Sequence, residues 1–384
     1  MNKLLNNQTQ YVSDIDLSQL NIGAIDNQTF SNLNHLNTLI LSYNLLSSLP
    51  SNLFADLINL NELLLDNNQL KSPLPSDLFK SLTKLDVLYL WDNKLQSLND
   101  SNLFASLTQL SELSLASNSL TNINVNLFQK LINLESLLLC QNQLSSFESN
   151  DYFKGLINLQ SLDLSSNLIQ NLNSTLFSDL IKLTALYLND NNLALLPSNL
   201  FVNLKNLLTL TLQNNKIRYL DKNLFNQLKS LEWLDLSYNR LSTLDSGLFE
   251  QLSQLTTLRL TNNQLLSLDF NLFSKLTNLN VLYLCVNSMR SLDARLFTNL
   301  TSLTLLDLRA NSFNQLSENI FSRLGQLTSL DLSSNRFDTL PLNLFQNLTQ
   351  LVELMLNNNR LRELSPLMFK NLINLQSIYV ANNM

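Results

Sequence analysis

The sequence predicts an α/β repeat solenoid, in which one short strand-and-loop unit recurs along the chain. Three observations support this prediction. A frame of 24 or 25 residues restarts fourteen times, leucines alternate at the start of each copy, and asparagine and phenylalanine recur at fixed positions within it. Self-similarity at such a period is typical of stacked repeats, where neighbouring units supply the core that one unit cannot bury alone.

The repeating frame is LxxLxLxxNxLxxLxxxxFxxLxx, as in residues 36–59. Its complete copies begin at Leu36, Leu60, Leu85, Leu110, Leu134, Leu159, Leu183, Leu207, Leu231, Leu255, Leu279, Leu303, Leu327 and Leu351. A degenerate copy from Val12 precedes them and a truncated copy from Leu375 follows. No linker or change of composition interrupts the series. We therefore expect an N-terminal extension over residues 1–11 and a single domain of about sixteen repeats over 12–384.

Each position of the frame has a physical role. In Leu-x-x-Leu-x-Leu the alternating leucines point to one side and the intervening residues to the other, which predicts a short strand buried on one face. The ninth position is asparagine in all fourteen complete copies, from Asn44 to Asn359. A buried side-chain amide there can satisfy the N–H and C=O groups of the adjacent loop. These positions predict a parallel sheet on one side of the solenoid and loops or short helical turns on the other.

Fifteen of the nineteen phenylalanines fall at the nineteenth position of the frame or its shifted equivalent, and we expect them to stack beneath the loop side. They are Phe30, Phe54, Phe79, Phe104, Phe128, Phe153, Phe177, Phe201, Phe225, Phe249, Phe273, Phe297, Phe321, Phe345 and Phe369. These positions account for folding and give no information about partners.

This frame resembles the typical 24-residue leucine-rich repeat, from Val12 to Asn383. Proteins with this repeat include Toll-like receptor ectodomains and variable lymphocyte receptors. The resemblance implies a leucine-rich-repeat horseshoe or arc whose concave face carries the parallel sheet. It also implies a receptor-like role in binding partners, commonly with that sheet. Those relatives usually carry Cys-rich caps, which this chain of two cysteines lacks.

No pattern of catalytic or metal-binding residues emerges. The single histidine, His35, precedes a strand and lies off the sheet face, and no clustered Cys/His spacing offers ligands to a transition metal. The four glycines are too scattered for a phosphate-binding loop. Cys140 and Cys285 are six strands apart, or about 29 Å at about 4.8 Å per strand, which is too far for a disulfide. We predict no enzyme, no cofactor, no metal site and no intramolecular disulfide.

Charge is distributed unevenly over the frame. Its second, third, fifth, seventh and eighth positions, which we expect to face solvent beside the strands, hold fifteen acids against two bases, Arg259 and Arg309. One interpretation is a negative face that steers a basic partner; the other is that Asp suits a strand flanked by a loop in any such repeat. An acidic face disfavours nucleic acid. No apolar run of eighteen residues occurs, so the chain as given has no membrane span.

Aromatic side chains on the solvent face of the sheet are candidates for partner contact. We expect a first group around Tyr89 and Trp91, a second around Trp233, and a third around Tyr283. With Tyr187 at the equivalent position of another repeat, the candidate partner-binding residues are Ile40, Leu64, Val87, Tyr89, Trp91, Tyr187, Trp233, Asp235, Arg259, Tyr283, Asp307 and Arg309. The second group also contains Asp235, Tyr238 and Arg259, and the third also contains Val281, Leu305 and Arg309.

These features favour a non-enzymatic module that binds a protein or peptide on its sheet face, with a basic partner preferred. The alternative is a structural or scaffold segment of a longer leucine-rich-repeat receptor or adhesion protein, because the chain ends one strand into a copy. For the compartment, the extracellular space or the cell surface is favoured over the cytoplasm. The repeat subtype indicates the cell surface or the extracellular space, whereas the missing signal peptide and disulfides indicate the cytoplasm.

Overall fold

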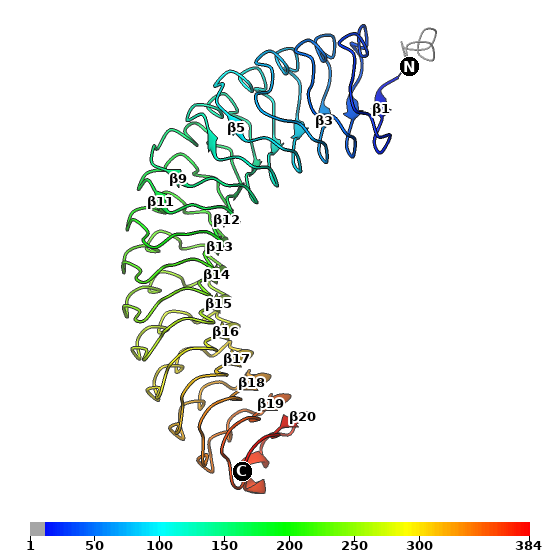
Figure 1. The fold of residues 1–384 in the computed structure, drawn as a ribbon. Coiled ribbons are helices and arrows are strands. Elements are labelled where there is room, and N and C mark those ends of the chain that lie inside the picture. Colours follow the sequence, from blue (N-terminus) through cyan, green and yellow to red (C-terminus); the bar gives the residue numbers. More distant parts are fainter. Residues whose placement is uncertain (1–11) are drawn as a thin grey trace. The chain divides into compact units, whose positions relative to one another are not determined.

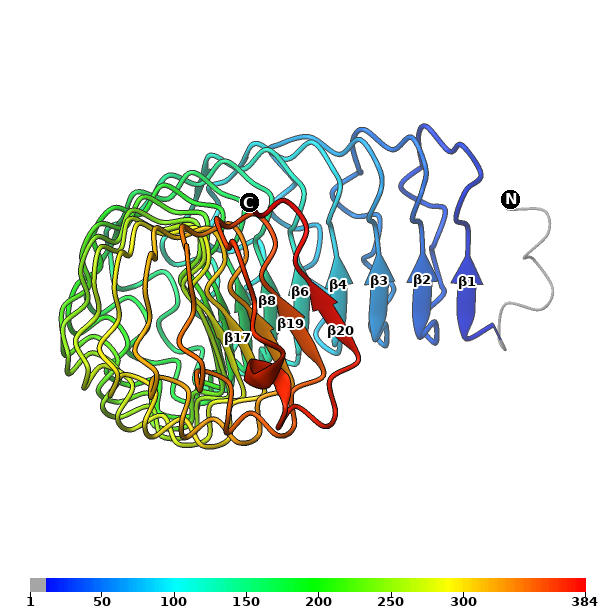
Figure 2. The same cartoon turned by 90° about the horizontal axis from the view of Figure 1, so that it is seen from below.

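The computed structural model describes residues 12–384, and the predicted extension over 1–11 lies outside this part. The chain divides into two compact units, the first ending at Asn192 and the second running from Leu193 to Met384. Each unit consists of short parallel strands on one side and turns on the other (Figures 1 and 2). This arrangement confirms the predicted repeat solenoid.

In unit 1 the main sheet follows the order of the chain. Its strands are β1 (Asp14–Asp16), β2 (Thr38–Ile40), β3 (Glu62–Leu64), β4 (Val87–Tyr89), β6 (Glu112–Ser114), β8 (Ser136–Leu138), β10 (Ser161–Asp163) and β12 (Ala185–Tyr187). Two smaller parallel sheets lie outside it. They pair β5 (Ser97–Leu98) with β7 (Asn122–Ile123) and β9 (Ser146–Phe147) with β11 (Asn171–Leu172).

Unit 2 repeats the plan of the main sheet and adds one short helix. Its strands are β13 (Thr209–Thr211), β14 (Trp233–Asp235), β15 (Thr257–Arg259), β16 (Val281–Tyr283), β17 (Leu305–Asp307), β18 (Ser329–Asp331), β19 (Glu353–Met355) and β20 (Ser377–Tyr379). A 3-10 helix, η2, spans Pro366–Phe369. In both units the pairing keeps the frame, so that equivalent positions of successive repeats lie side by side, as Leu234 does with Leu258.

The core of each unit is a set of leucine and phenylalanine columns. The middle residue of a strand, such as Leu39 or Leu258, is fully buried, while the residues on either side of Leu39 are only half-buried. The phenylalanines stack as expected, and the ring centroids of Phe225 and Phe249 are 6.3 Å apart. Stacking of each repeat on the next thus provides the buried surface that a single repeat of this size could not.

The asparagines at the ninth position form a second ladder, which confirms their predicted role. The Nδ2 group of Asn68 donates to the carbonyl of Leu41 in the preceding repeat at 2.9 Å and to that of Leu65 in its own repeat at 3.2 Å. Its Oδ1 accepts the N–H of Leu46 at 3.0 Å. One buried side chain thereby satisfies backbone groups from two repeats, which would be costly to bury unpaired.

The eighth position has a conformation that the frame alone does not predict. In every complete repeat its φ is positive, between 50° and 58°, as at Asp92, Asp190, Tyr238 and Val286. This left-handed region is disfavoured for most residues and best tolerated by Asn, Asp and Gly. Part of the Asp and Asn content beside the strands is therefore a requirement of the backbone.

Candidate functional site

The face of the sheet opposite the leucines presents the third and fifth positions of each repeat, and the seventh follows just after the strand. All twelve candidate residues occupy these positions, so each unit places its own candidates along one row of neighbouring strands. Most of them are half-buried, while Asp235 and Asp307 are buried and Arg309 is exposed. The surface is consequently better packed than a set of free side chains on a flat sheet would be.

In unit 1 the first candidate group forms a continuous patch, which we call the unit 1 patch: Ile40, Leu64, Val87, Tyr89 and Trp91. Register places Ile40 beside Leu64, and Leu64 beside Tyr89. Val87 lies on the same strand as Tyr89, and Trp91 follows that strand. All five side chains are half-buried. Tyr187, at the end of β12, pairs with Asp163 and lies outside the patch, further along the same sheet.

Acidic groups surround the unit 1 patch. The hydroxyl of Tyr89 donates to Oε1 of Glu112 at 3.0 Å. Burial raises the pKa of Tyr89 to about 12, and the hydrogen bond to Glu112 and the negative charges of Glu112, Glu62 and Asp66 act in the same direction. The phenol is therefore neutral at physiological pH and sits within a negatively charged border. Such a border favours a cationic group near the aromatic rings.

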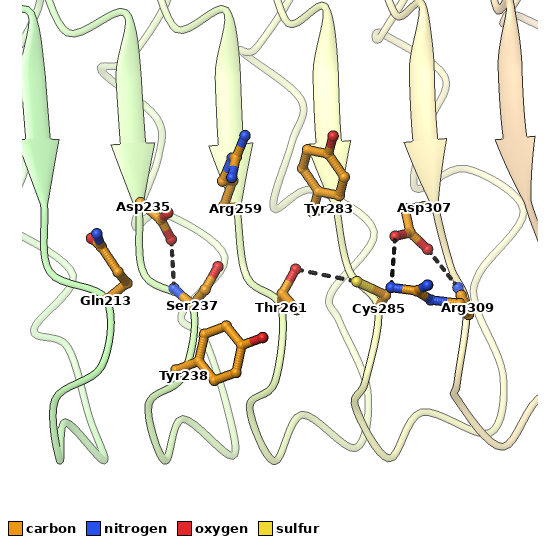
Figure 3. Close-up of a pocket in the computed structure, with 10 residues that line it drawn as sticks. All are labelled: Gln213, Asp235, Ser237, Tyr238, Arg259, Thr261, Tyr283, Cys285, Asp307 and Arg309. Atoms are coloured by element: carbon orange, nitrogen blue, oxygen red, sulfur yellow. Dashed lines mark hydrogen bonds and ion pairs between the residues drawn. The ribbon is translucent and has the colours of Figure 1, made fainter. Parts of the chain in front are cut away.

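In unit 2 the second and third candidate groups meet at one pocket of about 260 Å³, which we call the Arg259 pocket (Figure 3). Its lining combines residues mainly at the fifth and seventh positions of successive repeats. They are Gln213, Asp235, Ser237, Tyr238, Arg259, Thr261, Tyr283, Cys285, Asp307 and Arg309. Arg259 and Tyr283 were predicted in separate groups, whereas they line one pocket in the structure. Gln213, Ser237, Thr261 and Cys285 were not among the predicted residues, although the seventh position that they share could have identified them.

Arg259 is held by two aromatic rings. Its guanidinium carbon lies 4.8 Å from the ring centroid of Trp233 on β14 and 4.9 Å from that of Tyr283 on β16. Because β15 runs between these two strands, the arginine is flanked on both sides by its neighbours. Its Nε and the Oε1 of Gln213 are buried without a hydrogen-bond partner among the described residues. Trp233 does not itself line the pocket but packs against the guanidinium of Arg259, which does.

Asp307, Cys285 and Arg309 form the opposite side of the pocket (Figure 3). Oδ1 of Asp307 accepts the backbone N–H of Arg309 at 2.9 Å, and its Oδ2 lies 3.9 Å from Nη2 of Arg309. Burial raises the pKa of Asp307 despite these contacts. Burial also raises the pKa of the Cys285 thiol to about 11, so that this group is neutral at physiological pH.

Neither cysteine forms a disulfide in the described part of the chain. Cys140 and Cys285 are both free thiols. Over residues 12–384, no group of three or more His, Cys, Asp and Glu side chains is placed to hold a metal ion. Within the same residues, the fold contains no helix with the length and apolar character needed to cross a bilayer.

A family model described as leucine rich repeat matches most of the chain. The matched residues are 10–70, 133–193, 181–241, 205–265, 234–285, 253–313, 277–337 and 325–384. Among curated proteins, none matches this sequence.

Several solved structures are similar over most of the chain. A chain of the Toll–Spatzle complex of Drosophila is 28% identical with a TM-score of 0.82, and the match covers 89% of this chain and 47% of that one. A chain of the TLR13–ssRNA13 complex is 28% identical with a TM-score of 0.73, over 99% of this chain and 63% of that one. A leucine-rich-repeat protein of Leptospira interrogans is 27% identical with a TM-score of 0.67, over 91% and 97% of the respective chains.

The chain thus spans less than two thirds of the chains from the Toll and TLR13 complexes that it matches. Their structures are of a complex with Spatzle in one case and with ssRNA13 in the other. The prediction that nucleic acid is disfavoured as a partner therefore receives no support from these similarities.

Proposed function

Because the chain belongs to the leucine-rich-repeat family, we propose that it is a non-enzymatic module that binds a protein or peptide on the sheet face of its repeats. The similar structures from Toll and TLR13 are of complexes, which supports a binding role of this kind. We infer a protein partner because the unit 1 patch with its acidic border and the Arg259 pocket each combine aromatic side chains with individual charged side chains. This is the composition of protein contact sites.

The unit 1 patch is the observation that carries the proposal. Five apolar or aromatic side chains lie together on the sheet face from β2 to just after β4, where polar residues would normally face solvent. Contiguous apolar surface that remains accessible on a folded protein commonly marks an interaction site. Tyr89 and Trp91 are the residue types that most often dominate the energy of such contacts.

The charges around the patch favour a basic partner. Glu62, Asp66 and Asp92 lie on or directly after strands of the patch, and Glu112 lies on the adjacent strand β6. None of the four has a cation paired with it among the described ion pairs. A lysine or arginine of a partner would contact the aromatic rings and these carboxylates together. We therefore expect association that weakens as ionic strength rises.

A peptide library displayed on phage tests the proposal and does not require an identified partner. Selection against the whole chain should enrich peptides that combine lysine or arginine with apolar residues. Trp91→Ala and Tyr89→Ala should each weaken the selected peptides by about tenfold or more, the loss typical of a contact hot spot. Both variants should keep the far-UV circular dichroism of the parent.

The matched control is Tyr219→Ala, because Tyr219 is an exposed aromatic residue in the loop after β13 and off the sheet. It should leave peptide affinity unchanged. Peptides that bind Trp91→Ala and Tyr89→Ala as tightly as the parent would show that the patch is not the contact surface. Enrichment of no peptide, together with tight binding of single-stranded RNA, would replace the protein partner with a nucleic acid.

A further inference from the structure

The guanidinium of Arg259 is fixed in place by contacts that leave its hydrogen-bonding edge unused. The ring centroids of Trp233 and Tyr283 lie 4.8 and 4.9 Å from its central carbon, and ring faces attract a cation through their π electrons without occupying its N–H groups. An arginine restrained in this way loses less conformational freedom when it binds a ligand than a free side chain would. The guanidinium of Arg259 is therefore a preorganised hydrogen-bond donor.

The other charged groups of the Arg259 pocket already have partners. Arg309 pairs with Asp307, and Asp235 accepts the backbone N–H of Ser237 at 2.9 Å. The sulfur of Cys285 and the hydroxyl of Thr261 are 3.2 Å apart and share a hydrogen bond. Among the described residues that line the pocket, Arg259 is the charged side chain with neither an ion pair nor a hydrogen bond. Its Nε is buried, whereas its two Nη atoms have no hydrogen-bond partner among the described residues and are not buried, so these are the donors that a ligand can reach.

The chemistry of the missing partner follows from these contacts. A guanidinium has five N–H donors and no acceptor, so its partner must supply oxygen acceptors, and a planar carboxylate matches the fork of two parallel N–H groups. The carboxylates of Asp235 and Asp307 at the same pocket oppose a dianion such as a phosphate ester more strongly than a monoanion. The neutral Cys285 adds no further negative charge. A single carboxylate is the group that this pocket suits best.

We propose that Arg259, clamped between Trp233 and Tyr283, receives a carboxylate of the bound protein, from an acidic side chain or from a chain terminus. This inference rests on the proposed binding of a protein partner by the sheet face. Arg259 would then select an acidic group of the partner at one point on a largely acidic surface. A partner that is basic elsewhere would be required to carry a carboxylate at this point, which provides specificity beyond overall charge.

Fluorescence of Trp233 can report occupation of the pocket, because its ring contacts Arg259. The chain has two tryptophans and nine tyrosines, so the Trp91→Phe variant leaves Trp233 as the single tryptophan, which can be excited apart from the tyrosines. The probes are three capped tripeptides: triglycine with a free carboxylate, triglycine amide, and the amide with a central glutamate. The two that carry a carboxylate should give a saturable change with a dissociation constant in the millimolar range, and the amide should give none.

Substitutions at Arg259 make the test specific. Arg259→Gln should weaken binding of the carboxylate peptides by about tenfold or more, and Arg259→Lys should weaken it less because it retains the charge without the fork. Arg336→Gln, which removes an exposed cation outside the pocket, should leave binding unchanged. A response to only one carboxylate peptide supports the proposal and identifies the source of the group.

An equal response to triglycine amide, or an undiminished response in Arg259→Gln, would overturn the proposal. So would binding of a phosphoserine tripeptide in preference to the glutamate peptide. These outcomes are separate from those of the library experiment. Selected peptides that depend on Trp91 and Tyr89, together with silent carboxylate probes, would refute the role of Arg259 and leave the proposed function standing.

Discussion

At the scale of single residues, the acidic character of the sheet side has more than one cause. Asp92 and Asp190 occupy the eighth position, where φ is positive and aspartate is tolerated for its backbone. Asp235 and Asp331 each accept the N–H two residues later, at 2.9 and 2.8 Å, as turn-forming residues commonly do. Among the described residues, the carboxylate of Glu62 accepts no such backbone hydrogen bond. Only a part of the acid excess is therefore available as evidence for a basic partner.

Asp307 gives a prediction about pH, because burial raises its pKa above the ordinary value of 3.8 in spite of Arg309. The folded protein thus holds this proton more tightly than the unfolded chain does. The resulting stabilisation is present below the unfolded pKa and is lost as the pH rises through the folded pKa. An asparagine at this position would not ionise, and its side-chain oxygen could still accept the N–H of Arg309.

We therefore expect Asp307→Asn to unfold at a higher temperature than the parent at pH 7, with the difference disappearing near pH 3. Thermal unfolding followed by circular dichroism at both values measures it. Asp338→Asn, at an exposed position of the same unit, serves as the control for the loss of one charge. A parent protein that is the more stable of the two at pH 7 would show that the pair with Arg309 outweighs burial.

At the scale of elements, the frame predicted most of what the structure contains. Strands at the third to fifth positions, the asparagine ladder and the stacked phenylalanines follow from residue type and period alone. The small sheets β5–β7 and β9–β11 were not predicted, because two-residue strands leave no alternation to detect. The clamp around Arg259 was not predicted either, because it depends on how side chains from β14, β15 and β16 orient across the sheet.

The phenylalanine column makes a prediction about the stacking of repeats. Phe249 is fully buried, with the rings of Phe225 and Phe273 each 6.3 Å away. Phe369 is only half-buried and stacks on Phe345 alone among the described residues. Phe249→Ala should therefore lower the free energy of unfolding by about 3–5 kcal/mol, and Phe369→Ala by clearly less.

Urea unfolding of both variants by circular dichroism provides the comparison. Because stability in stacked repeats is carried by interfaces between neighbours, the interior variant should also broaden the transition. Equal losses at the two positions would mean that a second ring neighbour contributes nothing to the column.

At the scale of the whole molecule, half of the acidic residues and both tryptophans lie at the frame positions beside the strands. The second, third, fifth, seventh and eighth positions of the repeats together carry a net charge of −13. The rest of the chain carries a net charge of +7, which brings the total to −6. Both tryptophans lie on or directly after strands of the main sheets. The separation of acidic from basic residues could be predicted from the sequence, because the frame assigns each residue to one side of the repeat. The contacts between these side chains could not be predicted, because they depend on side-chain orientation.

Oxidative footprinting of the chain with and without a selected peptide tests the central claim most directly. Tyr89 and Trp91 should be oxidised more slowly in the complex, because the peptide would cover the sheet face on which they lie. Tyr219, which is 54% exposed and off the sheet, should be oxidised at the same rate in both. Protection of Tyr219 with no change at Tyr89 and Trp91 would contradict the account and place the binding surface on the loops.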